Sequence, residues 1–200
     1  MHAKRIKTTT WQSSANRIIS TAIFTLSACM LVACDAPVPV EKPQAAISAF
    51  ASQLQRELKT ALQADGPTGA VGVCHTRAAE IATTVGTGFG VEIGRTSMRL
   101  RNHANTPDDW EKEQLAMFRQ QLGDGADPAA LSAAAAKNMN GRTSYRYMQP
   151  IIVQPLCLTC HGTTLDPGLA AAIDELYPQD EARGYRAGEL RGAFTVSWQK

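Results

Sequence analysis

The sequence of 200 residues lacks several features that would indicate a function directly. It has no internal repeat and no basic cluster interleaved with aromatic residues of the kind that binds nucleic acid, so we expect no nucleic-acid partner. The glycine-rich stretch Gly86-Thr-Gly-Phe-Gly90 lacks the Lys-Ser/Thr of a phosphate-binding loop and the spacing of a dinucleotide fingerprint, so it predicts a turn. No stretch resembles a kinase, a cyclase or another signalling output domain.

Composition and charge are those of an ordinary globular protein. The apolar fraction of 44% is sufficient for a core, and 200 residues predict one domain. The formal net charge of +2 gives a misleading impression, because Lys4, Arg5, Lys7 and Arg17 all lie in an N-terminal segment without acidic residues. The rest of the chain is therefore slightly acidic.

Residues 1–33 have the pattern of a bacterial lipoprotein signal peptide. A basic start precedes an apolar run from Ile18 to Val32, which is shorter than the ~20 residues that a membrane-spanning helix needs. The run ends in Leu31-Val-Ala-Cys34, which resembles a lipobox, so Cys34 is the predicted lipidation site. We expect a membrane-tethered protein on the periplasmic side of a bacterial membrane, although a secretory leader or an uncleaved anchor would fit the same pattern.

A proline-rich tether, residues 34–43, precedes the predicted folded domain, residues 44–200. Apolar residues at three- and four-residue steps predict a helix that ends at Asp65-Gly66-Pro67, and a second helix that begins near Thr68. Cys74 lies on the apolar face of the second helix, whereas His75 is rotated away from it by about 100°.

The second half of the chain mixes strands with helices. We predict strands at 91–97, 144–153 and 192–198, a helix capped by Thr106, and a helix that starts at Asp166-Pro167. The alanine-rich segment 129–137 predicts a short helix that gives way to a strand near Lys137, before a hairpin turn at Asn140-Gly141. Together these elements predict an α+β fold, with an antiparallel sheet flanked by helices in a single domain.

Cys157-Leu-Thr-Cys160-His161 has the spacing at which c-type haem is attached. The two thiols add across the haem vinyl groups, and the adjacent imidazole of His161 is placed to bind iron. One covalently attached haem c is therefore the predicted cofactor, and Pro155 predicts a short helix that carries the motif. A redox-active dithiol without haem would use the same two cysteines, but the βαβ pattern of a thioredoxin-like protein is missing.

Cys74 is the thiol that this assignment leaves over. Cys29 leaves with the leader, Cys34 takes lipid, and the motif takes Cys157 and Cys160. From spacing alone, Cys74 is either a small buried hydrophobic residue or an iron ligand whose thiolate the metal stabilises. His103 and Met98 are rival ligands if Cys74 is not used.

Several separated segments together resemble one family, the single-haem c-type proteins of PAS-like fold that were formerly a domain of unknown function. The resemblance covers residues 45–198 and rests on the order and spacing of these segments: Val73-Cys74, Gly94–Asn102, Asn105–Glu111, Tyr147–Ile151, Cys157–Gly162 and Gly184–Phe194. It implies a five-stranded antiparallel sheet and iron ligated by His161 and Cys74.

The two haem propionates need donors or cations if they are buried near protein. The candidates are Arg95, Arg99, Arg101 and Arg146, with Asn102 and Tyr147 as neutral donors.

We therefore predict a haem protein that is not an enzyme. It would act either as a redox sensor, which could also sense a diatomic gas, or as a low-potential electron carrier. Because the chain contains no output domain, a sensor would need a separate redox or signalling protein as its partner. The alternative is a haem enzyme, a peroxidase or reductase, which would need an open distal iron site and an acid–base group such as His103 or His75.

Overall fold

A computed structural model describes residues 37–139 and 141–200. Pro37–Lys200 form one compact unit. The predicted signal peptide and the first three residues of the tether, which include the predicted lipidation site Cys34, lie outside the described residues, whereas residues 37–43 of the tether are described. Within these residues, no helix combines the length and apolar character needed to cross a membrane.

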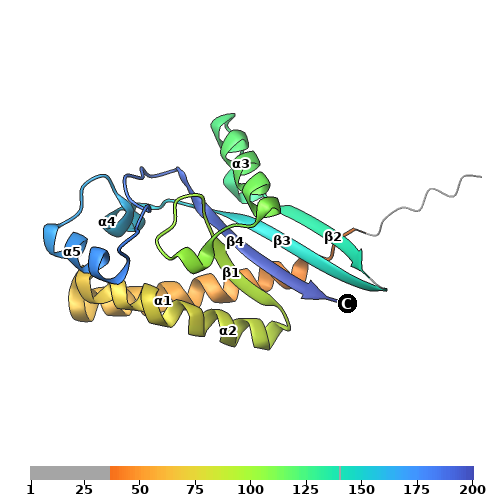
Figure 1. Cartoon of the computed structure of the whole chain (residues 1–200), viewed down its shortest axis with the longest axis horizontal. Coiled ribbons are helices and arrows are strands. Elements are labelled where there is room, and N and C mark those ends of the chain that lie inside the picture. The colour runs from red at the N-terminus through yellow and green to blue at the C-terminus, as the bar shows by residue number, and fades with distance from the viewer. Residues whose placement is uncertain (1–36, 140) are drawn as a thin grey trace, which may run out of the picture. The chain divides into compact units, whose positions relative to one another are not determined.

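The centre of this unit is an antiparallel sheet (Figure 1). Its strands are β1 (Glu92–Thr96), β2 (Ala133–Met139), β3 (Arg142–Ile152) and β4 (Leu190–Gln199), in the order β1-β4-β3-β2. Every neighbouring pair is antiparallel. The prediction of an α+β domain with an antiparallel sheet flanked by helices is confirmed. Within the described residues the sheet has four strands, one fewer than the family resemblance implies.

The alanine-rich segment is the clearest error of the sequence-based prediction. Ala133–Met139 are a strand throughout, and only Pro128–Ala130 form a short 3₁₀ helix (η3). Met139 pairs with Arg142 across the predicted two-residue turn, where Gly141 has a positive φ of 80°. The helix propensity of alanine is a weak preference, and pairing with β3 along the whole of β2 overrides it.

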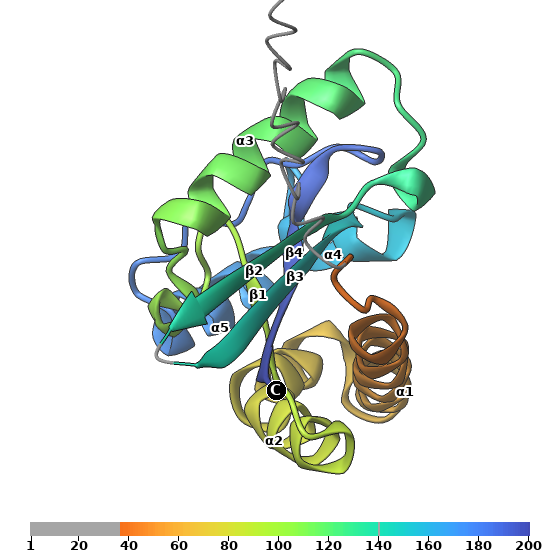
Figure 2. The same cartoon turned by 90° about the vertical axis from the view of Figure 1, so that its right-hand side faces the viewer.

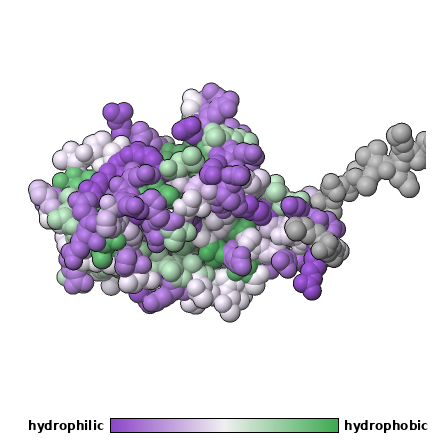
Figure 3. All heavy atoms as spheres, in the orientation of Figure 1, coloured by the Kyte–Doolittle hydropathy of each residue, from purple (hydrophilic) through white to green (hydrophobic). Residues whose placement is uncertain are grey.

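Helices cover both faces of the sheet (Figures 1 and 2). α3 (Asp109–Gly123) covers one face, where Leu115 and Phe118 pack on Met148. Its N-terminus is a capping box of Asp108 and Glu111, two residues later than the predicted cap Thr106. α1 (Glu41–Gly72) and α2 (Ala78–Phe89) cover the other face. In Figure 3 hydrophilic residues dominate the visible surface, and hydrophobic ones form small separate patches.

The layer of α1 and α2 contains two interruptions of regular helix. Gly66, with φ 68° and ψ −172°, kinks α1 just before Pro67, at the position where the sequence predicts a helix end. The second interruption is a π-helical turn, η1 (Val73–Arg77), between α1 and α2. This turn contains Cys74, and single π turns of this kind are frequent at functional sites.

The remaining elements cap one end of the sheet. η4 (Pro155–Cys157), α4 (Leu158–His161) and α5 (Pro167–Leu176) follow β3, and α5 lies against α1. Asp166 caps α5 through the backbone amides of Gly168 and Leu169, as its sequence predicts. A further 3₁₀ turn, η2 (His103–Asn105), links β1 to α3.

Phe118 tests the packing of α3 on the sheet. Phe118 is completely buried, whereas its neighbour Met117 is 38% exposed. We expect Phe118→Ala to lower the free energy of unfolding by about 3 to 5 kcal/mol, and Met117→Ala to change it by less than about 0.5 kcal/mol. Urea denaturation followed by circular dichroism measures both. Equal effects of the two changes would contradict the described orientation of α3.

Candidate cofactor site

The Cys-Leu-Thr-Cys-His motif lies on the short helical segment η4–α4, as predicted. Cys157 ends η4, and its sulfur accepts a hydrogen bond from the backbone N–H of Gln154 at 3.3 Å. Cys157 and Leu158 pack against a buried cluster of Val153, Ala182 and Tyr185. Cys157, Cys160 and His161 are all partly buried and not paired in disulfides. The motif thus packs on an apolar cluster, and neither of its thiols is used in a disulfide.

His161 is held in the tautomer that a metal ligand requires. Its Nδ1 donates a hydrogen bond to the carbonyl oxygen of Ala182 at 2.6 Å. Burial lowers the pKa of His161 to about 3, and the positive charges of Arg191 and Arg101 contribute to the decrease. The imidazole is therefore neutral at physiological pH. With Nδ1 engaged as a donor, the lone pair of Nε2 is the one available to a metal.

A buried ion pair fixes the backbone around the motif. Arg101 Nε and Asp180 Oδ1 are 3.1 Å apart, and the side chains are 9% and 1% exposed. Arg101 Nη2 donates to the carbonyl oxygen of Cys160 at 2.6 Å. Asp180 Oδ1 accepts a hydrogen bond from the backbone N–H of Ala182 at 3.0 Å. The pair therefore positions both the second cysteine and the residue whose carbonyl orients His161.

Cys74, in the π turn η1, lies close enough to the motif for its charge to act on Cys160. Burial raises the pKa of Cys160, Arg101 lowers it, and a negative charge on Cys74 raises it again. A charge on Cys74 also contributes to raising the pKa of Tyr177 to about 12, after the larger effect of burial. Cys160 packs against the cluster that joins Val71 of α1 to α5. The π turn thus brings Cys74 within electrostatic reach of the motif.

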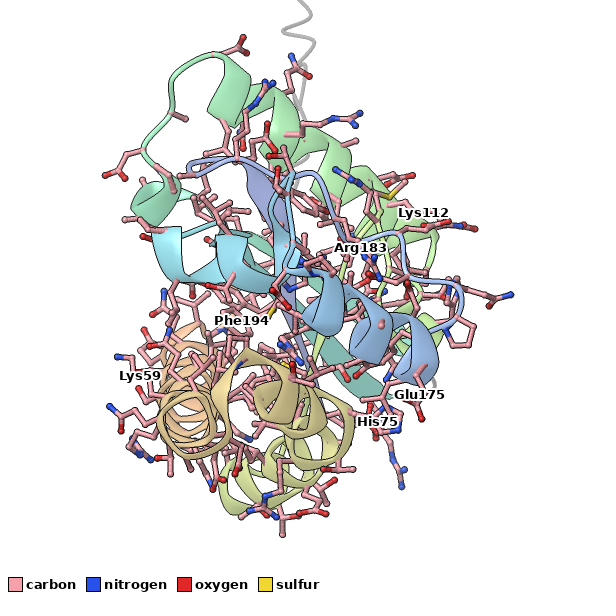
Figure 4. All side chains as sticks on the ribbon, turned by 90° about the vertical axis from the view of Figure 1, so that its left-hand side faces the viewer. Lys59, His75, Lys112, Glu175, Arg183 and Phe194 are labelled. Atoms are coloured by element: carbon pink, nitrogen blue, oxygen red, sulfur yellow. The ribbon has the colours of Figure 1, made fainter. Side chains whose placement is uncertain are left out.

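His75, next to Cys74, faces a hollow beside the motif. The hollow has a volume of about 340 Å³, and His75, Arg101, His103 and Tyr177 are among its lining residues. The rings of His75 and Tyr177 meet edge to face at 5.2 Å. Figure 4 views this end of the molecule, with α4 and α5 in front and His75 beside the end of α5 that carries Glu175. Polar side chains therefore line this approach to the site.

The predicted propionate contacts divide into groups near the motif and groups away from it. Arg101 is near but already paired with Asp180. Arg99 is also near, where it stacks on Tyr185 at 4.3 Å and donates through Nε to the Glu181 carbonyl at 3.2 Å. Arg95 lies over Phe50 at 5.8 Å, on the face of the sheet that α1 covers.

The other predicted contacts are committed elsewhere. Arg146 lies on the α3 face, paired with Asp108 at 2.7 Å and Glu111 at 3.0 Å. Alternation along β3 places Arg146 on the face opposite Tyr147. Tyr147 is a core residue whose hydroxyl accepts a hydrogen bond from Gln44 at 3.2 Å. Asn102 caps η2 through Ala104, although it also lines the hollow.

The two rival iron ligands, His103 and Met98, differ in their surroundings. His103 Nε2 is 3.0 Å from the Gln179 carbonyl oxygen, and Met98 is 55% exposed to solvent. Neither carries an interaction with Cys157 or Cys160 among the residues described.

Arg191 is a site residue that the sequence did not reveal. Its positive charge acts on His161, and its guanidinium lies 5.4 Å from the ring of Tyr185. The predicted strand begins at Gly192, two residues after the first residue of β4, so Arg191 lies outside it. The available signal was its position within Gly184–Phe194, one of the segments that carry the family resemblance.

Comparisons with known proteins agree with this fold. The model of the Tll0287-like family matches residues 26–198. The crystal structure of the cyanobacterial heme-protein Tll0287 is similar, with a TM-score of 0.57 and 22% sequence identity. The match covers 78% of this chain and 94% of that one, and at this identity it shows a common fold. No curated protein matches the chain significantly.

Asp180→Asn tests the ion pair beneath the motif. Burial raises the pKa of Asp180, but hydrogen bonds from Arg101 and Arg183 outweigh it, so the net pKa is lowered. Removing the charge leaves Arg101 buried without its partner, and we expect a loss of about 3 to 5 kcal/mol in the free energy of unfolding at neutral pH.

The pH dependence of this loss provides the control. A lowered pKa in the folded state stabilises the protein above the unfolded value of about 3.9, and this stabilisation disappears as the pH falls through the folded value. The difference between wild type and Asp180→Asn in chemical denaturation should therefore shrink below about pH 4. The exposed Asp124→Asn should change stability little at any pH. A difference that is constant down to acid pH would exclude this role.

Proposed function

Because the chain belongs to the Tll0287-like family, we propose that it binds one haem c, attached through Cys157 and Cys160, with His161 and Cys74 as axial ligands. The observation that carries the proposal is the hydrogen bond from His161 Nδ1 to Ala182, which leaves Nε2 of a neutral imidazole for iron. This is the arrangement in which histidine ligates metals.

The donor set suits haem iron better than an ion held by protein alone. Within the described part of the chain, no cluster of three or more His, Cys, Asp and Glu side chains could hold a metal ion. Haem iron needs only two protein ligands, because the porphyrin supplies the other four. A second point of fit is the buried Nε of Arg191, for which the described residues offer no acceptor. Haem propionates are acceptors of the kind that such a donor needs.

Each of the four proposed haem-binding residues would then have a separate role. Haem supplies one-electron chemistry at its iron, and the thiols of Cys157 and Cys160 would hold it covalently. His161 would bind from the side of α4, oriented by Ala182. Cys74 would bind from the π turn as a thiolate, which donates electron density and favours ferric iron. The hollow beside His75 is adjacent to this second ligand.

With both axial positions filled, this chain is better suited to redox sensing or low-potential electron transfer than to catalysis at iron. A thiolate ligand lowers the reduction potential, and reduction weakens its bond to iron. Release of Cys74 would open a position at which a diatomic gas could bind. A signal would then have to reach a separate redox or signalling protein. The alternative, a peroxidase or reductase, needs an iron position that is open in the resting protein.

Absorption spectroscopy of the full chain, made with a c-type maturation system, tests the proposal. We expect covalently bound haem with a low-spin ferric spectrum of thiolate character. Cys74→Ala should abolish that character while the haem stays attached, because Cys157 and Cys160 are unchanged. Cys157→Ala with Cys160→Ala should prevent attachment.

The other outcomes separate the competing hypotheses. A protein without haem contradicts the proposal as a whole. Five-coordinate high-spin iron in the wild type favours the enzyme. An unchanged spectrum in Cys74→Ala would show that another residue is the second ligand, and His75→Ala and His103→Ala would then identify it.

We also propose that Cys34 carries lipid and tethers the protein to the periplasmic side of a bacterial membrane. The support is the lipobox-like Leu31-Val-Ala-Cys34 after a basic and apolar leader. Cys34→Ala should block lipidation and leave the precursor uncleaved, detected as a larger band on an immunoblot. Metabolic labelling with a fatty acid should mark the wild type alone. Equal labelling of both chains would refute the assignment.

A further inference from the structure

A β-bulge turns Arg191 toward the haem motif. Ile151 pairs with Gly192 and Ile152 with Leu190, so Arg191 is an extra residue without a partner on β3. The bulge allows Leu190 and Ala193 to face the same α3-side cluster. Arg191 instead donates through Nη1 to Ser97 Oγ at 3.0 Å and to the Arg99 carbonyl oxygen at 3.1 Å. Two fixed acceptors thus hold its guanidinium in one orientation.

The guanidinium of Arg191 is only partly satisfied. Its Nε is buried and has no hydrogen-bond acceptor in the described residues. A buried donor of a charged group left without an acceptor is costly, so its presence indicates an acceptor that the protein alone does not provide.

The surroundings of Arg191 carry an excess of positive charge. Burial lowers the pKa of Arg191, and the charges of Arg101 and Arg95 lower it further, partly offset by Tyr185. Asp180 is the buried carboxylate nearby, but it is shared by Arg101 and Arg183. No ion pair joins Arg191 or Arg95 to a carboxylate of residues 37–139 or 141–200. The group that completes this cluster should therefore be an anion.

The location of the cluster narrows the choice of anion. The ring of Tyr185 lies 5.4 Å from the Arg191 guanidinium and 6.3 Å from the ring of His161. The anion site is therefore near His161, the proposed iron ligand, and a haem bound by this residue would lie within its reach. A haem carries two carboxylates at one edge, and arginine binds carboxylates through parallel hydrogen bonds.

We propose that Arg191 binds a carboxylate, and that this carboxylate is a propionate of the attached haem. The inference rests on the proposed function and assigns a residue to it. Arg191 differs from Arg101 and Arg146, whose charges are already neutralised by Asp180 and by Asp108 with Glu111. A free organic acid from solution would offer the same chemistry, and the experiment distinguishes the two sources.

The test compares the haem-loaded full chain with its Arg191→Gln variant by potentiometric titration and resonance Raman spectroscopy. A guanidinium beside a propionate keeps the carboxylate ionised and stabilises the reduced haem, whose net charge is more negative. We expect Arg191→Gln to shift the midpoint potential to more negative values. The propionate should also gain a higher pKa, so the potential should vary between mildly acidic and neutral pH, unlike that of the wild type.

Matched variants separate charge, geometry and folding. Arg191→Lys keeps the positive charge but loses the planar guanidinium that forms two parallel hydrogen bonds. Its midpoint potential should therefore lie between those of wild type and Arg191→Gln, and its propionate Raman band should differ from that of wild type. Arg95→Gln should produce a smaller shift in the same direction. Arg119→Gln removes a charge from an exposed position of α3 and should change neither quantity. Thermal unfolding shows which variants are folded, and Arg191→Lys decides the question if Arg191→Gln does not load haem.

Three outcomes would overturn the proposal. If the potential, its pH dependence and the propionate band are unchanged in folded Arg191→Gln, Arg191 has a structural role only. If the potential depends on added acetate or citrate in wild type but not in Arg191→Gln, and the propionate band is constant, the ligand is a free anion. If Arg119→Gln shifts the potential as much as Arg191→Gln, the effect is one of net charge. A wild type without haem would contradict the proposed function itself.

Discussion

The ion pair between Arg101 and Asp180 is the constraint on which the rest of the site depends. It joins the segment after β1 to the loop after α5, which are distant in sequence, and it does so in a nearly water-free position. Two charges in such a place are stable only when their other hydrogen-bonding atoms are also satisfied. The atoms that satisfy them belong to Cys160, Ala182 and Arg183. The same hydrogen bonds therefore stabilise the ion pair and fix the geometry of the Cys-Leu-Thr-Cys-His motif.

The sequence was most informative where local chemistry decides structure. Asp166-Pro167 starts a helix, Gly66-Pro67 interrupts one, and Gly141 has a positive φ just before β3. Backbone conformation at these positions depends on few neighbours. It failed where tertiary contacts decide. The alanines of β2 have helical propensity, but they pair with β3 in the sheet.

The residues of the candidate site differ in how readily the sequence indicates them. The thiols and His161 are adjacent in sequence, so their spacing alone indicates their chemistry. The prediction of Cys74 as a ligand comes from the family resemblance, since nothing in its own helix distinguishes an iron ligand from a small buried residue. Arg191 depends on a bulge opposite Ile151 and Ile152, and a bulge leaves no pattern of residue types in a single sequence. Its importance follows from a missing acceptor, which only a three-dimensional structure can reveal.

The π turn at Val73–Arg77 contains one residue more than an α-helical turn. The side chains before it and after it therefore point in different directions around the helix axis. Val71 belongs to the cluster with α5, whereas Ala78, Ile81 and Val85 belong to the cluster with Phe50. In an unbroken α-helix, the rotation of about 100° per residue would fix the direction of Val71 relative to that of Ala78, Ile81 and Val85. The helix could then not pack equally well against both clusters. The extra residue in the turn absorbs the mismatch. Natural selection could therefore change the residue at position 74 and retune the chemistry next to the motif, without disturbing either hydrophobic cluster.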